Sequence, residues 1–202
     1  MMKNSFVFVI VLVSIAADIA VGTSYPSPWV QKGIHKQQGP GYLGQINNHN
    51  CGPHALMQSI FKVTGVDMKE ATLANWAGTT TSGTGHDGIE KALKRFNSEH
   101  HYNLTINWFN FHDVSVKQIG QWMANPRTAI FFHLLYRDQW GHYELPYNIT
   151  SGASTLVIAN SLGDRKGDGY LGYFETRSWA AQKQYIAEMS QKSVCVITYP
   201  AK

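Results

Sequence analysis

The order of hydrophobic patterns along the chain predicts an α+β fold, with helices first and a mostly antiparallel sheet after them. Between about residues 52 and 96, apolar residues recur at the spacing of amphipathic helices. After about residue 102, the pattern changes to alternating or continuous apolar runs of strand length. Helices followed by strands are typical of α+β proteins, whereas α/β folds alternate the two regularly.

The first helix is expected to begin at Pro53 and to end near Gly65. Proline suits the first helical position because its missing N–H would be unpaired there in any case. Leu56, Ile60 and Val63 then fall on one face of that helix. The other helices are expected at about 68–76, after the Gly/Thr-rich loop 78–88, at about 115–124 and at about 178–189.

Five or six strands are expected in the second half of the chain. They cover Leu104–Phe109, Thr128–Leu135, His142–Tyr147, Thr155–Asn160, Tyr170–Phe174 and Ser193–Thr198. The unbroken apolar run of 128–135 predicts a buried central strand. Pro146 predicts that its own strand lies at a sheet edge or contains a bulge, because proline cannot donate a ladder hydrogen bond.

The N-terminal residues 1–24 have the layout of a secretory signal peptide. Lys3 precedes a nearly unbroken apolar run from Phe6 to Ile19, and small residues follow it. Because this run is shorter than about 18 residues, cleavage is favoured over retention as a membrane anchor. Residues 25–44, rich in Pro and Gly, are expected to form an extended leader, and 45–202 a single domain. We therefore expect a secreted or cell-surface protein with no stable membrane insertion.

Composition excludes several functional classes. The chain carries a net charge of +4 with 15% charged residues, and it has no long Lys/Arg run, so nucleic acid is not an expected partner. The loop 78–88 lacks the lysine of a nucleotide-binding P-loop. His86 and Asp87 lack a convincing second set of ligands, so no metal or other cofactor is expected.

Cys51 is the residue that most favours catalysis. It lies directly before the first predicted helix, where the helix dipole and unpaired N–H groups stabilise a thiolate, the form that attacks carbonyls. Gln45, six residues upstream, is placed so that its side-chain amide can help to bind an oxyanion. The alternative is a structural disulfide with Cys195, since paired cysteines are common in secreted proteins. Cys195 lies in an apolar strand, where a buried free thiol is also normal.

A cysteine hydrolase needs a base beside the sulfur and a group that orients the base. Of the nine histidines, His142 is the preferred base because it begins a strand after a turn and so lies at a sheet end. His54 is expected to point away from the sulfur, and His133 to be a hydrogen-bonded core residue. Asn160 ends the next strand, and its amide oxygen can accept the N–H of the His142 ring. Asp164 is the competing orienting residue.

These residues occur in the order found in papain-like cysteine peptidases. Gln45, Asn-Cys51-Gly-Pro, Gly-His142-Tyr and Asn160, together with the phrase Ala77-Gly-Thr-Thr-Thr-Ser-Gly-Thr, resemble a compact branch of that family. This branch contains the bacteriocin-processing peptidases and the pseudomurein endoisopeptidases that cut archaeal cell walls. The similarity covers about 43–165. It implies a papain-like fold in which the cysteine begins a helix packed on a mostly antiparallel sheet.

The resemblance implies a role for each matching residue: Cys51 as nucleophile, His142 as base, Asn160 as orienting residue and Gln45 as oxyanion donor. The compact branch usually has Asp where this chain has Asn160, whereas papain itself has Asn. The implied activity is that of a thiol protease or amidase cleaving a peptide or isopeptide bond. The expected partner is a peptide, including the peptide cross-links of a cell wall.

Two alternatives use the same residues differently. A secreted binding or structural protein on a degenerate peptidase fold would explain the altered third residue and the aromatic-rich composition. An acyl transferase would use the same side chains with an amine in place of water. If the protein is an enzyme, the loop 78–88 is expected to form a wall of the substrate cleft, and Trp140, near His142 in the sequence, is expected to lie at the cleft.

Overall fold

The computed structural model describes residues 37–38, 41–136, 140–150, 155–163, 165–166, 169–186 and 192–201. The expected signal peptide, most of the expected leader, Asp164 and the side chain of Trp140 lie outside the described part. The helices are α2 (Cys51–Thr64), α3 (Glu70–Ala77), α4 (His86–His100), the short 3₁₀ helix η1 (Phe111–Asp113), α5 (Val116–Ala124) and α6 (Trp179–Ile186). The predicted α+β class is confirmed.

Described strands form one antiparallel sheet. They are β1 (Gln37–Gln38), β2 (Gly41–Leu43), β3 (Thr105–Phe109), β4 (Thr128–Tyr136), β5 (Trp140–Thr150), β6 (Thr155–Asn160), β7 (Arg165–Lys166), β8 (Gly169–Ser178) and β9 (Val194–Thr198). Their order is β1-β2-β8-β6-β5-β4-β9-β3, and β7 pairs with β8 outside that path. Strand β4 lies between β5 and β9, as the apolar run predicts for a central strand.

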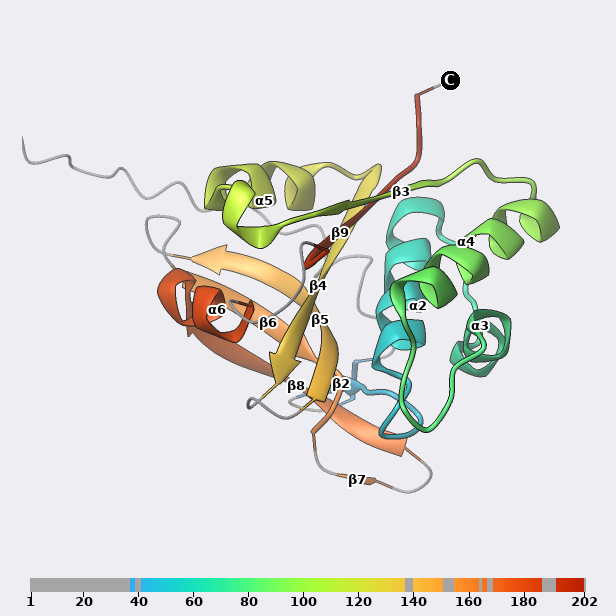
Figure 1. Ribbon diagram of the computed structural model, residues 1–202, viewed down its shortest axis with the longest axis horizontal. Coiled ribbons are helices and arrows are strands. Elements are labelled where there is room, and N and C mark those ends of the chain that lie inside the picture. The colour runs from blue at the N-terminus through green and yellow to red at the C-terminus, as the bar shows by residue number, and fades with distance from the viewer. Residues whose placement is uncertain are drawn as a thin grey trace, which may run out of the picture.

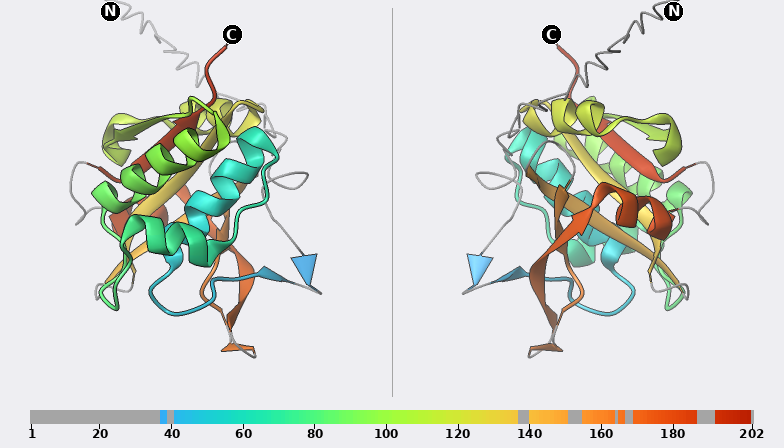
Figure 2. Two further views of the ribbon diagram at one scale, coloured as in Figure 1. Left: turned by 90° about the vertical axis from the view of Figure 1, so that its right-hand side faces the viewer. Right: turned by 90° about the vertical axis from the view of Figure 1, so that its left-hand side faces the viewer.

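The helices lie on opposite faces of this sheet. Figure 1 shows α2, α3 and α4 together on one side and α6 on the other. The two views of Figure 2 show the same division, with α2, α3 and α4 toward the viewer on the left and α6 on the right. Consequently β4 is covered on both faces, and Phe131, Phe132 and Leu134 are all fully buried.

Strand β5 has a local feature that matters for the site. It pairs with β4 from Trp140 to Glu144 but with β6 only from Leu145 onward. The ladder to β6 shifts register between Pro146 and Asn148, so the bulge expected at this proline is present, while the strand is internal rather than at an edge. Among the described strands, the first residues of β5 thus have no partner on the side away from β4. The start of α2 approaches them on that side.

Some boundaries differ from the sequence predictions. Helix α2 begins at Cys51 rather than Pro53, so the cysteine is its first residue and Asn50 is the N-cap. Helix α4 begins at His86, inside the expected loop. Two stretches of the expected leader form strands: β1 (37–38) pairs with β2 (41–43), and β2 pairs with β8. No helix among the described residues is long and apolar enough to cross a membrane.

Candidate active site

Cys51 begins α2 at the open side of β5. Its side chain is only 5% exposed, and the sulfur is in hydrogen-bonding contact with the backbone amide of Tyr143, the residue after His142. Gly52 permits this approach: a Cβ there would lie 3.0 Å from Ile89 Cδ1, 3.1 Å from Thr84 Cβ and 3.3 Å from Tyr143 Cδ2. The helix start is therefore held tightly between α4 and β5.

Burial decides the protonation state of the thiol. It raises the pKa of Cys51 from 9.0 to about 11, and the negative charge of Glu70 acts in the same direction. Backbone hydrogen bonds from Tyr143, Gly52 and Cys51 itself lower the pKa by a smaller amount. The sequence expectation of a thiolate stabilised by the helix start is therefore wrong for the resting protein, because desolvation outweighs those local backbone groups.

His142 and Asn160 are adjacent, as predicted. The Nε2 atom of His142 lies 3.0 Å from Oδ1 of Asn160, and both residues are completely buried. With Oδ1 as the acceptor, the proton on this side of the ring is on Nε2, which leaves Nδ1 as the ring nitrogen for proton exchange. The hydrogen bond fixes the orientation of the imidazole in the manner required of a base.

The burial of His142 differs from the sequence expectation of a ring at an open sheet end. Burial lowers the pKa of His142 to about 4, the hydrogen bond to Asn160 opposes this, and the charges of Arg177 and His54 lower it further. The ring is therefore neutral at neutral pH, the protonation state of a base. Together with the thiol, it forms a neutral pair in the resting protein.

The surroundings of Asn160 explain why an amide occupies this position. Its Nδ2 donates to the hydroxyl of Tyr173 at 3.1 Å and to Oε1 of Glu175 at 3.3 Å. An aspartate there would place a second carboxylate beside Glu175 and would lose both donated bonds. The departure from the Asp of the compact peptidase branch therefore has a local electrostatic reason.

Gln45 is part of the same cluster but is already engaged. It is fully buried, its Oε1 accepts from Ser161 Oγ at 2.7 Å, and its Nε2 donates to the carbonyl of Asn47. Because Ser161 follows Asn160, this contact ties the predicted oxyanion donor to the end of β6. The structure joins His142 to Asn160 directly and Gln45 to the residue after Asn160, and it places the sulfur of Cys51 against the backbone of the residue after His142. The amide of Gln45 is turned toward its own loop.

Glu70 is a residue of this region that the sequence analysis missed. It lies at the start of α3 and is 6% exposed. Its Oε1 accepts from Ile46 N at 2.9 Å and from Asn50 Nδ2 at 3.0 Å, and its Oε2 lies 2.9 Å from His54 Nδ1. One carboxylate thus holds the residues that follow Gln45 and precede Cys51. His54, expected to point away from the sulfur, points into this buried network.

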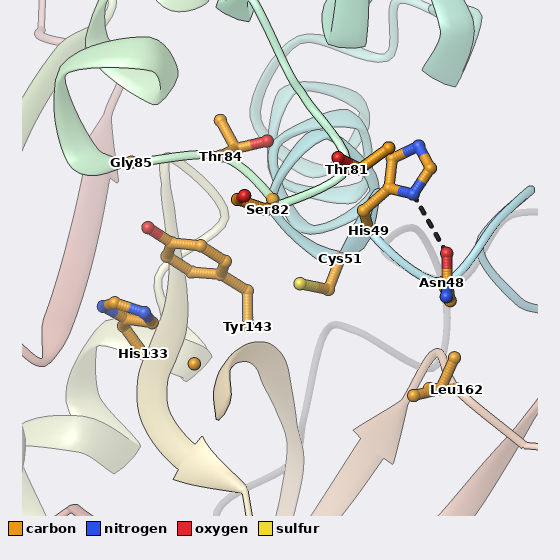
Figure 3. Close-up of a pocket in the computed structure, with 12 residues that line it drawn as sticks. Asn48, His49, Cys51, Thr81, Ser82, Thr84, Gly85, His133, Tyr143 and Leu162 are labelled. Atoms are coloured by element: carbon orange, nitrogen blue, oxygen red, sulfur yellow. Dashed lines mark hydrogen bonds between the residues drawn. The ribbon is translucent and has the colours of Figure 1, made fainter. Parts of the chain in front are cut away.

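A pocket of about 630 Å³ opens beside Cys51 (Figure 3). One wall is the Gly/Thr-rich segment 81–85, as predicted for the loop after α3, and the opposite wall is formed by Gly141 and Tyr143 of β5. His133 also lines the pocket, and its Nδ1 lies 2.8 Å from His86 Nε2. His142 is buried behind this surface and is not among the residues that line the pocket.

The structure answers one alternative raised by the sequence. Cys51 and Cys195 are both free and buried, so the structural disulfide considered as the alternative to a free Cys51 thiol is absent. Among the described residues, no group of three or more histidine, cysteine or carboxylate side chains is arranged to hold a metal ion.

Comparisons with known proteins identify structural similarities only. No family model matches the chain, and no curated protein matches it significantly. It is similar to the peptidase domain of Streptococcus ComA, a bifunctional ABC transporter involved in a quorum-sensing pathway, with a TM-score of 0.49 and 17% identity over 80% of this chain and 100% of that one. The peptidase domain of Streptococcus mutans ComA gives a TM-score of 0.40 and 15% identity over 83% and 99%. At these values, conclusions about chemistry have to come from the site itself.

Proposed function

We propose that this protein is a secreted cysteine peptidase or amidase that cleaves a peptide or isopeptide bond. The observation that carries the proposal is the buried His142–Asn160 pair, joined at 3.0 Å, next to the peptide that contacts the sulfur of Cys51. The proposal assigns Cys51 as the nucleophile, His142 as the base and Asn160 as the group that orients the base, and it is supported by the pocket that Cys51 lines. The N-terminal sequence supports secretion.

The neutral resting pair favours one course of the reaction. As the sulfur bonds to the substrate carbonyl carbon, the thiol proton passes to Nδ1 of His142, and the carbonyl oxygen becomes an oxyanion. The backbone N–H of Cys51 stabilises that oxyanion. His142 then gives the proton to the leaving amine as the C–N bond breaks, and water hydrolyses the resulting thioester.

Gln45 joins this course only after a local rearrangement. Its Nε2 now donates to the carbonyl of Asn47 and would have to exchange that acceptor for the oxyanion. Such exchanges are common because catalytic hydrogen bonds often form only in the substrate complex. Peptide cross-links of a cell wall are the substrate class that we propose, on the basis of the ordered cysteine, histidine and loop motifs.

Two matched cysteine variants test the proposal. Cys51→Ala should abolish hydrolysis of a quenched peptide set that includes both α-linked and lysine side-chain-linked bonds. Cys195→Ala, which removes the other buried free thiol, should retain hydrolysis. Hydrolysis by Cys51→Ala at the wild-type rate would refute the proposal, and cleavage of α-linked peptides alone would exclude the lysine side-chain-linked bonds from its substrates.

A non-catalytic binding protein is the second candidate. It is favoured by the 5% exposure of Cys51 and by the raised pKa of its thiol, both of which reduce reactivity. Iodoacetamide labelling with peptide mapping separates the two candidates. Alkylation of Cys51 that is lost in His142→Ala supports the enzyme, whereas a thiol that remains inert in the folded wild-type protein supports the binding protein.

A further inference from the structure

A pair of histidines, of which His133 lines the pocket, has no role in the proposed reaction. His86 begins α4 and His133 lies in β4, and their rings meet through the 2.8 Å contact between His86 Nε2 and His133 Nδ1. The two rings are nearly perpendicular, at 89°. The ring of Tyr143 stacks on that of His133, with centroids 4.2 Å apart and an interplanar angle of 11°. The pair is therefore fixed in position by both walls of the pocket.

The second nitrogen of His133 faces the pocket wall at Gly141. A Cβ at position 141 would lie 2.9 Å from His133 Nε2, so this nitrogen lies close to the glycine backbone. Gly141 and His133 both line the pocket that contains Cys51. This nitrogen therefore belongs to the part of the pocket wall that Gly141 and His133 share, apart from the buried His142.

The pocket surface combines apolar area with uncharged polar groups. Its lining residues among the described part of the chain include hydroxyl, amide and imidazole side chains but no lysine, arginine, aspartate or glutamate. Tyr143 adds a hydroxyl that is buried and makes no hydrogen bond to a described residue. Figure 3 shows this hydroxyl directed toward the Thr84–Gly85 segment of the opposite wall. An unpaired buried hydroxyl at a ligand pocket indicates a position for a hydrogen-bonding group.

We propose that His133, supported by His86 and beside the Tyr143 hydroxyl, forms a subsite for an uncharged carboxamide side chain of the substrate. The inference rests on the proposed function, because it takes the pocket beside Cys51 as the substrate cleft. It adds a specificity-determining residue, since His133 contacts the substrate without exchanging a proton in the reaction.

The hydrogen bond between the two rings can form with His133 in either of its two neutral tautomers. When His86 Nε2 donates to His133 Nδ1, Nε2 of His133 carries a proton and donates to a carbonyl oxygen. When His133 Nδ1 donates instead, Nε2 of His133 is an acceptor for an amide N–H. An amide offers both a carbonyl oxygen and N–H donors, and either state can therefore bind it.

A carboxylate is a poor occupant of the same subsite at neutral pH. Its best partner would be a protonated imidazole, but burial, followed by the charges of His86 and His142, lowers the pKa of His133 to about 3. Burial, followed by the charge of Lys192, also lowers the pKa of His86, and Asp87 and Glu90 oppose this. Both rings remain neutral at pH 7, where burying an anion against them is unfavourable.

Binding of two isosteric probes tests the subsite without requiring catalysis. The full chain carrying Cys51→Ala is labelled with ¹⁵N in its histidine rings and titrated at pH 7 with acetyl-glutamine N-methylamide or acetyl-glutamate N-methylamide. The glutamine probe should shift the Nε2 signal of His133 saturably, and it should bind about tenfold or more tightly than the glutamate probe. His133→Phe should remove this difference, whereas His112→Phe, at an exposed position in η1, should retain it.

Two results would overturn the inference: no saturable shift of the His133 signal with either probe, or equal or tighter binding of the glutamate probe. If His133→Phe does not fold, the selectivity of the parent chain between the two probes still decides the matter. A protein that binds the glutamine probe at His133 but has an inert Cys51 would refute the proposed peptidase activity alone. A reactive Cys51 without probe selectivity would refute the subsite alone.

Discussion

Replacement of Glu70 should destabilise the protein far more than replacement of an ordinary glutamate on a helix. Glu70 accepts hydrogen bonds from Ile46 and Asn50 through one oxygen and contacts His54 through the other. The variant Glu70→Ala removes all three contacts at once. The perturbation therefore acts on the loop between Gln45 and Cys51 as well as on the packing of α3 against α2.

The magnitude follows from the burial of the three partners. Asn50 and His54 are 2% and 0% exposed, and a buried polar group that loses its partner costs about 1–3 kcal/mol. Ile46 is 41% exposed, so water can replace the lost acceptor at its N–H. The two buried partners together give an expected loss of about 2–6 kcal/mol. This is a large part of the roughly 5–15 kcal/mol that stabilises a domain.

The assay is urea unfolding followed by circular dichroism, with Glu99→Ala as the matched control. Glu99 also forms an ion pair within a helix, to Arg95 at 2.9 Å, but the two side chains are 47% and 55% exposed. Exposed pairs contribute about 0–1 kcal/mol. The stability of Glu70→Gln should lie between the stabilities of Glu70→Ala and Glu99→Ala. The glutamine retains an acceptor for Ile46 and Asn50 but offers a donor to His54.

Equal stability of Glu70→Ala and Glu99→Ala would refute this reasoning. A second measurement separates the charge of Glu70 from its contacts. Because that charge helps to raise the pKa of Cys51, Glu70→Gln should move the pH midpoint of Cys51 alkylation to a lower value. An unchanged or higher midpoint would contradict the electrostatic part of the argument.

Three further predictions concern the histidines and their partners. Asn160→Ala should reduce turnover about ten- to a hundredfold by removing the hydrogen bond to His142, and steady-state kinetics with unchanged turnover would contradict it. Gly141→Ala should displace His133, whose Nε2 would be 2.9 Å from the new Cβ, and should weaken the His86–His133 hydrogen bond, seen as a change in the ¹⁵N signals of the two rings. Because folding lowers the pKa of His142 from 6.5 to about 4, the unfolded state takes up the proton first, so stability present above pH 6.5 is lost as pH falls towards 4. At 1.36 kcal/mol per pH unit, the loss that is due to His142 is about 3 kcal/mol. Burial also lowers the pKa of His133 to about 3, so His133 adds to the loss; urea unfolding at several pH values should show a fall in stability of at least this size, and a flat profile in that window would refute the prediction.

The elements of the fold could be predicted because local patterns determine them. The continuous apolar run at 128–135 predicted a buried central strand, and β4 lies between β5 and β9. Pro146 predicted a bulge, and the register shifts beside it. Helix starts were less accurate: α2 begins at Cys51 and α4 at His86, because tertiary contacts rather than the position of proline or glycine determine the first turn.

The contacts within the site depend on pairings that no local pattern contains. His86 and His133 are 47 residues apart, and their hydrogen bond requires the first residue of α4 to approach β4. Glu70 looks like an ordinary acidic residue in the first turn of a helix, where it suits the helix dipole. Its burial depends on the loop before Cys51 folding across it, which only the three-dimensional structure reveals. His142 and Asn160 were accessible to sequence reasoning because adjacent strands bring their ends together.

The protonation state of the cysteine shows most clearly how local and tertiary effects compete. A helix start lowers a thiol pKa through groups within one turn, and backbone hydrogen bonds from Gly52 and Cys51 act in that direction. Packing against β5 excludes water from the same sulfur, and this larger effect raises the pKa to about 11. The burial that aligns Cys51 with the His142–Tyr143 peptide therefore also keeps its proton in place. A peptidase built on this site must move that proton during attack rather than beforehand, which makes the orientation of His142 by Asn160 a requirement of the chemical step.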